Sequence, residues 1–365
     1  MGGIQRQPRP AMNILILPGD GIGPEITNAT IDVLAAIDQR MSLGLAIEVR
    51  EIGLVTLKSQ GTTLPAEVMK RIPEVDGVIL GPVSHYDYPS RPEGGINQSA
   101  ELRVVFDLYA NIRPSRSRVG LSVLRKPMDV IIVRENTEGF YSDRNMHAGS
   151  GEFMPDADMA LSVRKITARA SNRVARAAFE IARGRRRKVT AVHKANVLKL
   201  SDGLFLREVR KVAQEYPDVE LEELIVDAMA ALLIRTPDRF DVIVTTNMFG
   251  DILSDEAAEL SGSLGLGGSI NVGDEICVAQ AQHGSAPDIA GKNIANPTSL
   301  ILSAAMLLDW RGRRDGNKAL IAAGAHITAA VDRVLENPRA RTRDIGGQLD
   351  TTAFTRIVSL AIGEG

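Results

Sequence analysis

The stretch NILILPGDGIGPE, residues 13–25, determines how the rest of the chain is interpreted. It joins a largely apolar run, Asn13–Leu17, to a glycine-rich turn. Consecutive apolar residues are typical of a strand that is covered on both faces of a sheet. Pro24 favours the start of a helix, and apolar residues follow at helical spacing as far as Ile37. The stretch therefore predicts a strand, a tight turn and a helix, which is the unit from which α/β proteins are built.

Short strands of similar character recur along the chain and alternate with amphipathic segments. After the first, they are Val78–Leu80, Asp129–Val133, Val189–Val192, Leu221–Val226 and Asp241–Thr245. This alternation predicts an α/β fold. The segment from Asn145 to Asp158 contains Gly, Pro and acidic residues without periodicity, which predicts a loop or an exposed arm. A chain of 365 residues has the length of about two domains.

The composition argues against several classes of protein. Lys plus Arg number 43 and Asp plus Glu 45, and this balance argues against a basic protein that wraps nucleic acid. No apolar stretch approaches the roughly 18 residues that cross a bilayer, so no membrane partner is expected. The single cysteine, Cys277, excludes an intrachain disulfide. Residues 1–11 lack the apolar core of a signal peptide and predict a disordered lead, so we expect a soluble cytoplasmic protein.

Unusual polar residues follow the predicted strands. Arg134 follows one strand, Lys194 the next and Asp227 the one after, and Asp251 comes after the last. Functional residues of open α/β sheets gather at the carboxyl ends of strands. The recurrence therefore predicts an active site at that edge of the sheet.

The glycine-rich turn has two interpretations. Residues 19–24, GDGIGP, resemble the GxGxxG dinucleotide fingerprint, but Pro24 occupies the place of the third glycine. We prefer a tight strand-to-helix turn that binds no cofactor by itself.

An acidic pair is the candidate metal site. Asp251 and Asp255 lie four residues apart and share one face of a predicted helix. Two carboxylates so placed repel each other unless a cation lies between them, and oxygen ligands suit Mg²⁺ or Mn²⁺. A solvated acidic helix face is the alternative, unless the fold brings Asp227 near.

Five residues are candidates for binding or proton transfer. Guanidinium groups bind carboxylates in a bidentate way, so Arg103, Arg113 and Arg134 would together suit a dicarboxylate or tricarboxylate. Taken singly, each is also compatible with a surface ion pair. Tyr141 and Lys194 are the candidate proton-transfer groups, with packing or solubility as the alternative.

A basic run covers Arg183 and residues 185–188. Binding of nucleic acid is one interpretation. We prefer a helix end, where cations complement the helix dipole.

Six segments in order resemble the β-decarboxylating dehydrogenases, the family of 3-isopropylmalate, isocitrate, homoisocitrate, and tartrate or D-malate dehydrogenases. They are GDGIGPE (19–25), DLYANIRP (107–114), RENTEGFYS (134–142), HKANVLK (193–199), NMFGDILSDEAAEL (247–260) and HGSAPDIAGKNIANP (283–297). The resemblance implies a two-domain isopropylmalate/isocitrate dehydrogenase-like α/β fold, not a classical Rossmann fold. Residues 12–108 plus 262–365 would form the cofactor-side domain, and residues 109–261 the central domain with the dimer interface and arm.

The resemblance also implies a chemistry, the oxidative β-decarboxylation of a 3-substituted (R)-malate. Arg103, Arg113 and Arg134 would hold the malate carboxylates, and Asp227, Asp251 and Asp255 would hold Mg²⁺ or Mn²⁺. Lys194 would act as the base and Tyr141 would protonate C3. In this family the equivalents of Lys194 and Asp227 reach into the neighbouring subunit's site. A homodimer with shared active sites is therefore implied.

By the same resemblance, the cofactor site lies in the segment 283–296 and not at the glycine turn. The residues implied are Asn196, His283, Gly284, Ser285, Ala286, Pro287, Asp288 and Asn296. NADP-preferring isocitrate dehydrogenases carry Lys-Tyr where this chain has Asp288-Ile289. A carboxylate suits the ribose hydroxyls of NAD and would repel a 2′-phosphate, so we expect NAD.

The substrate's C3 substituent would meet the segment before Arg103. Isocitrate enzymes carry Ser-x-Asn there, and this chain has Asn97 and Ser99 in exchanged order. A polar pocket rejects an isopropyl group, which favours isocitrate or homoisocitrate. The later segments look closer to the isopropylmalate and homoisocitrate branch, so 3-isopropylmalate stays open. The alternatives are a tartrate or D-malate dehydrogenase, a non-catalytic regulatory subunit of a heteromeric isocitrate dehydrogenase, and a different metal enzyme on a similar scaffold.

Overall fold

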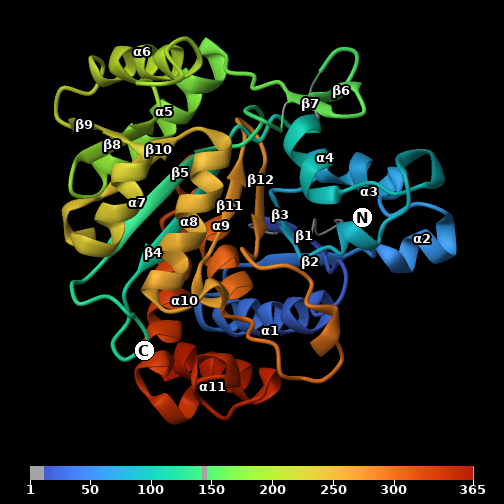
Figure 1. Ribbon diagram of the computed structural model, residues 1–365. Helices are drawn as coiled ribbons and strands as arrows, with labels where there is room; N and C mark the ends of the chain where they lie inside the picture. The colour runs from blue at the N-terminus through green and yellow to red at the C-terminus, as the bar shows by residue number, and fades with distance from the viewer. Residues whose placement is uncertain (1–11, 142–145, 365) are drawn as a thin grey trace, which may run out of the picture.

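The computed structural model describes residues 12–141 and 146–364, and its centre is a mixed sheet of ten strands (Figure 1). The strands lie in the order β2-β1-β3-β12-β11-β4-β5-β10-β8-β9, and β6 and β7 form a separate ribbon. The strands are β1 Met12–Leu17, β2 Leu45–Val49, β3 Gly77–Leu80, β4 Ala110–Arg116, β5 Asp129–Glu135, β6 Glu152–Asp156, β7 Met159–Ser162, β8 Lys188–His193, β9 Glu220–Ile225, β10 Val242–Thr245, β11 Ile270–Val272 and β12 Cys277–Gln280.

Helices cover both faces of the sheet. They are α1 Gly23–Met41, α2 Leu54–Gln60, α3 Ala66–Arg71, α4 Gln98–Val105, α5 Ala168–Arg183, α6 Ser201–Ala213, α7 Val226–Arg235, α8 Asn247–Ser261, α9 Thr298–Asp315, α10 Lys318–Glu336 and α11 Thr351–Glu364. Side chains alternate across a strand, so Ile132 of β5 packs with the α7 and α8 residues while Val133 packs with the α5 residues. Among the described residues, no helix combines the length and apolarity needed to cross a membrane.

The sheet consists of two parallel blocks that run in opposite directions. β1, β2, β3 and β12 are parallel to one another, and so are β5, β8, β9 and β10. Between the blocks, β11 is antiparallel to both β12 and β4, and β4 is antiparallel to β5. The carboxyl ends of β5, β8, β9 and β10 therefore share one edge of the sheet, where Arg134, Lys194 and Asp227 were expected to gather.

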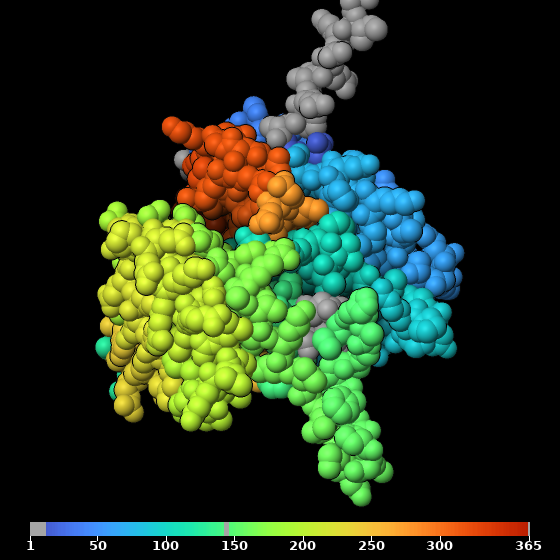
Figure 2. Space-filling model, turned by 90° about the horizontal axis from the view of Figure 1, so that it is seen from above, coloured from blue at the N-terminus to red at the C-terminus, as the bar shows by residue number. Residues whose placement is uncertain are grey.

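All six predicted strands are present in the sheet. Two residues of the predicted strands lie outside them, because Val226 begins α7 and Asp241 precedes β10. The expectation of a loop was wrong for residues 152–156, which form β6 of the β6–β7 ribbon. Both strands of this ribbon are exposed along their length, and Figure 2 shows the ribbon projecting from the body as an arm. Asn145 lies outside the described residues.

Three hydrophobic clusters form the core. One contains residues between 15 and 108 together with Val278, a second contains residues between 128 and 257, and the largest extends through both parts. The two smaller clusters support the division into residues 12–108 plus 262–365 and residues 109–261, which stays a proposal. The expected disordered lead, residues 1–11, lies outside the described residues.

Candidate active site

Asp251 and Asp255 both lie on α8 and face two arginines of the sheet. Arg113 on β4 donates from Nη1 to Asp255 Oδ1 at 2.9 Å, and the same Nη1 lies 3.4 Å from Asp251 Oδ1. Arg134 on β5 forms an ion pair with Asp251. This close approach depends on Gly250, because a Cβ there would lie 2.7 Å from Arg134 Cβ. The fold thus brings four of the predicted residues into one cluster.

Burial shapes the electrostatics of this cluster. Arg134 is almost fully buried, and burial, reinforced by the charge of Arg113, lowers the pKa of Arg134 to about 10. Arg134 therefore stays cationic at neutral pH. Burial also raises the pKa of Asp255. Asn247, the polar residue that follows β10 and begins α8, accepts from Arg134 Nε at 3.0 Å and from Nη2 at 2.7 Å through Oδ1. The guanidinium is consequently held in one orientation.

Tyr141 joins the same cluster. Its hydroxyl donates to Asp251 Oδ2 at 3.4 Å. Its ring centroid lies 5.8 Å from the Arg134 guanidinium carbon, within the range of a cation–π interaction. A phenol beside two carboxylates and two guanidinium groups is placed where it can donate a proton to a bound anion.

The remaining predicted substrate residues lie on or beside α4. Asn97 is the N-cap of α4, and its Oδ1 accepts from Ala100 N at 3.1 Å. Ser99 donates from Oγ to Gln280 Oε1 at 3.1 Å, and Arg103 lies one turn further along the helix. Gln280, at the end of β12, was not predicted, because nothing local in the sequence connects it with residue 99. Asn97 therefore has a structural role in α4 besides any role in binding.

Lys194 and Asp227 form a separate pair. Lys194 Nζ donates to Asp227 Oδ1 at 2.6 Å, and this hydrogen bond lowers the pKa of Asp227. The Asp227 side chain is 60% exposed. Within the described ranges, no three His, Cys, Asp or Glu residues are grouped to hold a metal ion. One chain therefore does not bring Asp227 together with Asp251 and Asp255.

The predicted cofactor segment borders a cavity of about 270 Å³. The lining includes His283, Gly284, Ala286 and Asn296 of the predicted set, together with Asp344. Asn296 donates from Nδ2 to Asp344 Oδ2 at 2.9 Å. Asp344 lies 48 residues away in the sequence, so its place at this cavity could not be predicted from local pattern.

The other predicted cofactor residues differ in their placement. Ser285 is buried, accepts from Ser84 Oγ at 2.8 Å and does not line the cavity. Pro287 and Asp288 are exposed in a short 3₁₀ helix next to the cavity. Asn196 lies in an exposed turn after β8 and does not line this cavity.

The glycine turn supports the cofactor segment. Ile22 N donates to Ser285 O at 2.8 Å, and a Cβ at Gly21 would lie 2.0 Å from the same oxygen. Gly19 and Gly21 both have positive φ, 77° and 59°. Residues 19–24 therefore form the tight turn that we preferred, and their glycines let the 283–296 segment approach closely.

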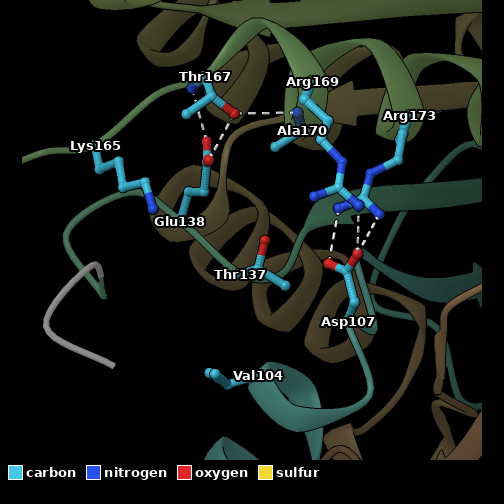
Figure 3. Close-up of a pocket in the computed structure, with 9 residues that line it drawn as sticks. All are labelled: Val104, Asp107, Thr137, Glu138, Lys165, Thr167, Arg169, Ala170 and Arg173. Atoms are coloured by element: carbon cyan, nitrogen blue, oxygen red, sulfur yellow. Dashed lines mark hydrogen bonds and ion pairs between the residues drawn. The ribbon is translucent and has the colours of Figure 1, made fainter. Parts of the chain in front are cut away.

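A second cavity, of about 320 Å³, lies between α4 and the start of α5 (Figure 3). In this view Arg169 and Arg173 reach from α5 to Asp107, which follows α4. Glu138 accepts from Thr167 N at 2.8 Å and from Thr167 Oγ1 at 2.7 Å. None of the predicted site residues lines this cavity. Its ion pairs join the two proposed domains.

We expect Asp107→Asn to lower the free energy of unfolding by up to about 1 kcal/mol at pH 7, since the ion pair is half exposed. Arg173 lowers the pKa of Asp107 through its hydrogen bonds. The pKa of Asp107 is thus lower in the folded state than in the unfolded state, where it is about 3.9. The stabilisation by the ion pair is therefore complete above about pH 4 and is lost as the pH falls toward the folded-state pKa. Asn tolerates the φ of 47° as well as Asp does. Urea unfolding should show that the difference in free energy of unfolding between the wild type and Asp107→Asn becomes smaller below about pH 4. A difference that does not change with pH would contradict this prediction.

Four residues of the basic run, Arg183, Arg185, Arg186 and Lys188, form ion pairs within the chain. Arg183 ends α5 and pairs with Asp218, and Arg185 pairs with Asp129 and Asp241. Lys188 lies 3.2 Å from Glu220. These contacts agree with the preferred interpretation of a helix end.

Comparison with known proteins gives a consistent result. Residues 13–358 match the model of the isocitrate/isopropylmalate dehydrogenase family. An isocitrate/homoisocitrate dehydrogenase of Thermus thermophilus is 44% identical over 354 residues, covering 96% of this chain and 99% of that protein. A 3-isopropylmalate dehydrogenase of Sulfurisphaera tokodaii is 39% identical, and the match covers 93% of this chain and 95% of that protein. A homoisocitrate dehydrogenase of Methanocaldococcus jannaschii is also 39% identical, and the match covers 93% of this chain and 94% of that protein.

The fold agrees with this assignment. The crystal structure of isocitrate dehydrogenase from Methylococcus capsulatus superposes with a TM-score of 0.84 at 37% identity, covering 96% of this chain and 99% of that one. The mixed ten-stranded sheet is thus the isocitrate dehydrogenase-like fold that the motifs predicted. With its family motifs in order and matches over nearly its whole length, the chain belongs to the isocitrate/isopropylmalate dehydrogenase family and is a β-decarboxylating dehydrogenase.

Proposed function

We propose that this chain is an NAD-dependent and metal-dependent dehydrogenase that oxidatively decarboxylates a 3-substituted (R)-malate, with isocitrate or homoisocitrate as its substrate. The cluster of Arg113, Arg134, Tyr141, Asp251 and Asp255 carries the proposal. It combines cations for substrate carboxylates, oxygen ligands for a metal and a phenol for proton transfer.

The charges of the cluster fit a divalent cation. Arg113 and Arg134 are neutralised by Asp251 and Asp255, so the four groups sum to zero. The two malate carboxylates of the substrate, entering without a cation, would leave two partly buried negative charges uncompensated at this cluster, which is costly. Mg²⁺ or Mn²⁺ would restore neutrality, and a purely carboxylate donor set suits these ions. Asp251, Asp255 and the partner subunit's Asp227 would hold the metal.

Each residue then has a defined task. Arg103, Arg113 and Arg134 would bind and orient the substrate carboxylates. The bound metal would polarise the C2 oxygen, and NAD would accept the hydride from C2. The partner subunit's Lys194 would accept the proton of the C2 hydroxyl. Tyr141 would donate a proton to C3 after the β-carboxylate has left as CO₂.

The cavity beside residues 283–296 supports NAD as the cofactor. Asp344 lines it, and Asp288 is exposed next to it. Two carboxylates at one site repel a 2′-phosphate and accept hydrogen bonds from ribose hydroxyls. Burial lowers the pKa of His283, so its ring stays neutral and adds no cation for a phosphate.

A homodimer with shared active sites would complete the metal site. The Lys194–Asp227 pair lies apart from Asp251 and Asp255 in the chain, yet all four groups are needed for the proposed chemistry. The β6–β7 ribbon exposes apolar side chains, including 51% of Phe153 and 62% of Met154, which a partner subunit would cover. Ile234 on α7 and Ile252 on α8 are each 59% exposed as well.

The polar side chains at the start of α4 favour a substrate with a polar C3 substituent. Ser99 and Gln280 are hydrogen-bonded to each other, so an isopropyl group packed on them would disrupt that pair without replacing it. The Thermus thermophilus relative is an isocitrate/homoisocitrate dehydrogenase. The Sulfurisphaera tokodaii relative is a 3-isopropylmalate dehydrogenase, which keeps 3-isopropylmalate as the second candidate.

The experiment is a parallel measurement of kcat/KM with isocitrate, homoisocitrate, 3-isopropylmalate, tartrate and D-malate. Chelator-treated enzyme is assayed with NAD, with and without Mn²⁺. We expect isocitrate or homoisocitrate to be preferred by about tenfold or more over 3-isopropylmalate, as for pockets that differ in polarity. Activity should require Mn²⁺.

The same panel tests the alternatives. A preference for 3-isopropylmalate, or for tartrate or D-malate, would reject the polar-substituent assignment. An enzyme that reduces NAD with none of the five compounds would support a non-catalytic regulatory subunit. The presence of Tyr141, Lys194 and all three aspartates argues against that outcome.

A further inference from the structure

Arg164 and Asp202 form a buried ion pair that the sequence analysis did not single out. The Asp202 side chain is fully buried and that of Arg164 is 8% exposed. Isolated buried charges are costly, and a buried pair adds little stability over well-packed apolar residues. A buried ion pair can instead hold the segments around it in one arrangement. The groups that are bonded to Arg164 and Asp202 therefore indicate what the pair does.

Asp202 holds the main chain of Lys194. Its Oδ2 accepts from Lys194 N at 2.5 Å, while its other oxygen faces Arg164. Lys194 O in turn accepts from Leu198 N at 2.8 Å, and Leu198 O accepts from Asp202 N at 3.0 Å. The turn between β8 and α6 is thus closed around Lys194 by the Asp202 carboxylate. The direction in which the Lys194 side chain leaves this turn depends on that carboxylate.

Arg164 connects this turn with the cluster on α8. Its Nη1 donates to Ser201 Oγ at 3.0 Å, and its Nη2 donates to Thr246 Oγ1 at 2.9 Å. Thr246 is the N-cap residue of α8, the helix that carries Asp251 and Asp255. The guanidinium carbon also lies 5.3 Å from the ring centroid of Phe249 on α8.

Arg164 also reaches two other segments. Its guanidinium carbon lies 5.9 Å from the ring centroid of Phe140, the residue before Tyr141. Arg164 itself follows the β6–β7 ribbon by two residues, and Val163 N donates to Gly151 O at the base of that ribbon. One guanidinium therefore contacts, or directly adjoins, the segments that carry Lys194, Tyr141, Asp251 and the ribbon.

We propose that Arg164 and Asp202 are positioning residues for the dehydrogenase reaction. They fix the main chain of Lys194 relative to α8 and to the ribbon, so that its ammonium group reaches the proposed site in the partner subunit. The inference rests on the proposed function, because it needs Lys194 as the base. A displacement of about 1 Å in a reacting group can cost roughly 100-fold in rate. The effect belongs to the chemical step and not to substrate binding.

The test uses the full-length enzyme with its preferred substrate, NAD and Mn²⁺. The double variant Arg164→Met/Asp202→Asn removes both charges together, so that no buried charge remains unpaired. Arg164→Lys keeps the charge but not the planar, multiply bonded group. The control is Arg185→Met/Asp241→Asn. This control removes a second partly buried ion pair, which lies at the opposite end of β10. Arg185 Nε is 2.7 Å from Asp241 Oδ1, and the Asp241 side chain is 1% exposed.

We expect the double variant to lower kcat by roughly 10- to 100-fold, as for a misplaced catalytic group, while the substrate KM changes by less than about threefold. With substrate deuterated at C2, the isotope effect on kcat should be at least as large as in the wild type, because hydride transfer becomes more rate-limiting. Arg164→Lys should recover part of the loss. The control pair should lower the melting temperature but leave kcat within about twofold, since it touches no site residue.

The outcomes separate the two proposals. A wild-type enzyme that oxidises none of the substrates rejects the proposed function, and the inference falls with it. With an active wild type, an unchanged kcat in the folded double variant rejects the inference alone. The same conclusion follows if activity falls only in proportion to the unfolded fraction, or if the control pair lowers kcat equally.

Discussion

Two inactive variants, Lys194→Met and Tyr141→Phe, are expected to restore activity when their subunits are combined. Each substitution alone should lower kcat by roughly 10²- to 10⁴-fold, because each removes a proposed proton-transfer group. In a mixed dimer, one site would combine an intact Tyr141 with the partner subunit's intact Lys194, and the other site would lack both. One of the two sites in each mixed dimer is then intact, so purified mixed dimers should show about half of the wild-type activity.

This result would show that the two groups act across the subunit interface. The chain itself places Lys194 with Asp227, apart from the cluster of Tyr141, Asp251 and Asp255. The measurement is kcat of mixed dimers that are co-expressed with two different affinity tags and purified on both. A control mixture of Tyr141→Phe with Asp251→Asn, whose residues lie in one cluster, should stay inactive. If doubly tagged dimers that carry Lys194→Met in one subunit and Tyr141→Phe in the other show no activity, the site is not shared between subunits.

The second large effect concerns the cofactor. We expect Asp288→Lys/Ile289→Tyr to shift the ratio of kcat/KM for NAD over NADP toward NADP by about 100-fold. The lysine removes a repulsive charge and offers a charge-assisted hydrogen bond, worth roughly 1.5–3 kcal/mol, to the 2′-phosphate. Asp344, which lines the same cavity, remains and limits the shift.

Steady-state kinetics with both cofactors measure this ratio. Asp238→Lys is a matched control, since it changes the net charge equally at an exposed position that pairs with Lys126 and lies outside the cavity lining. The control should leave the ratio unchanged. An unaltered ratio in the Asp288 variant would contradict the assignment of residues 283–296 as the NAD site.

Six of the ten strands of the central sheet were predicted from the sequence, whereas β2, β4, β11 and β12 were not. β1 and β10 are short apolar runs bounded by turns, a local pattern that survives in the structure. β4 was missed, because its sequence ANIRPSR contains Pro114 and two arginines and does not read as a strand. The segment that contains the ribbon was predicted to be a loop or an exposed arm and not a strand. Both faces of the ribbon are exposed, which removes the alternation that identifies a half-buried strand.

The sequence by itself determined the family, the order of the motifs and the pairing of Asp251 with Asp255 on one helix face, because these depend on local spacing. Only the tertiary structure decided which groups meet. Arg113 bonds Asp255 across 142 residues, and Lys194 and Asp227 lie apart from them. Contacts of this kind follow from the order and direction of the strands, in which antiparallel β11 and β4 join two opposed parallel blocks. The buried Arg164–Asp202 pair has the same origin, because charged residues carry no local sign that the fold will bury them together.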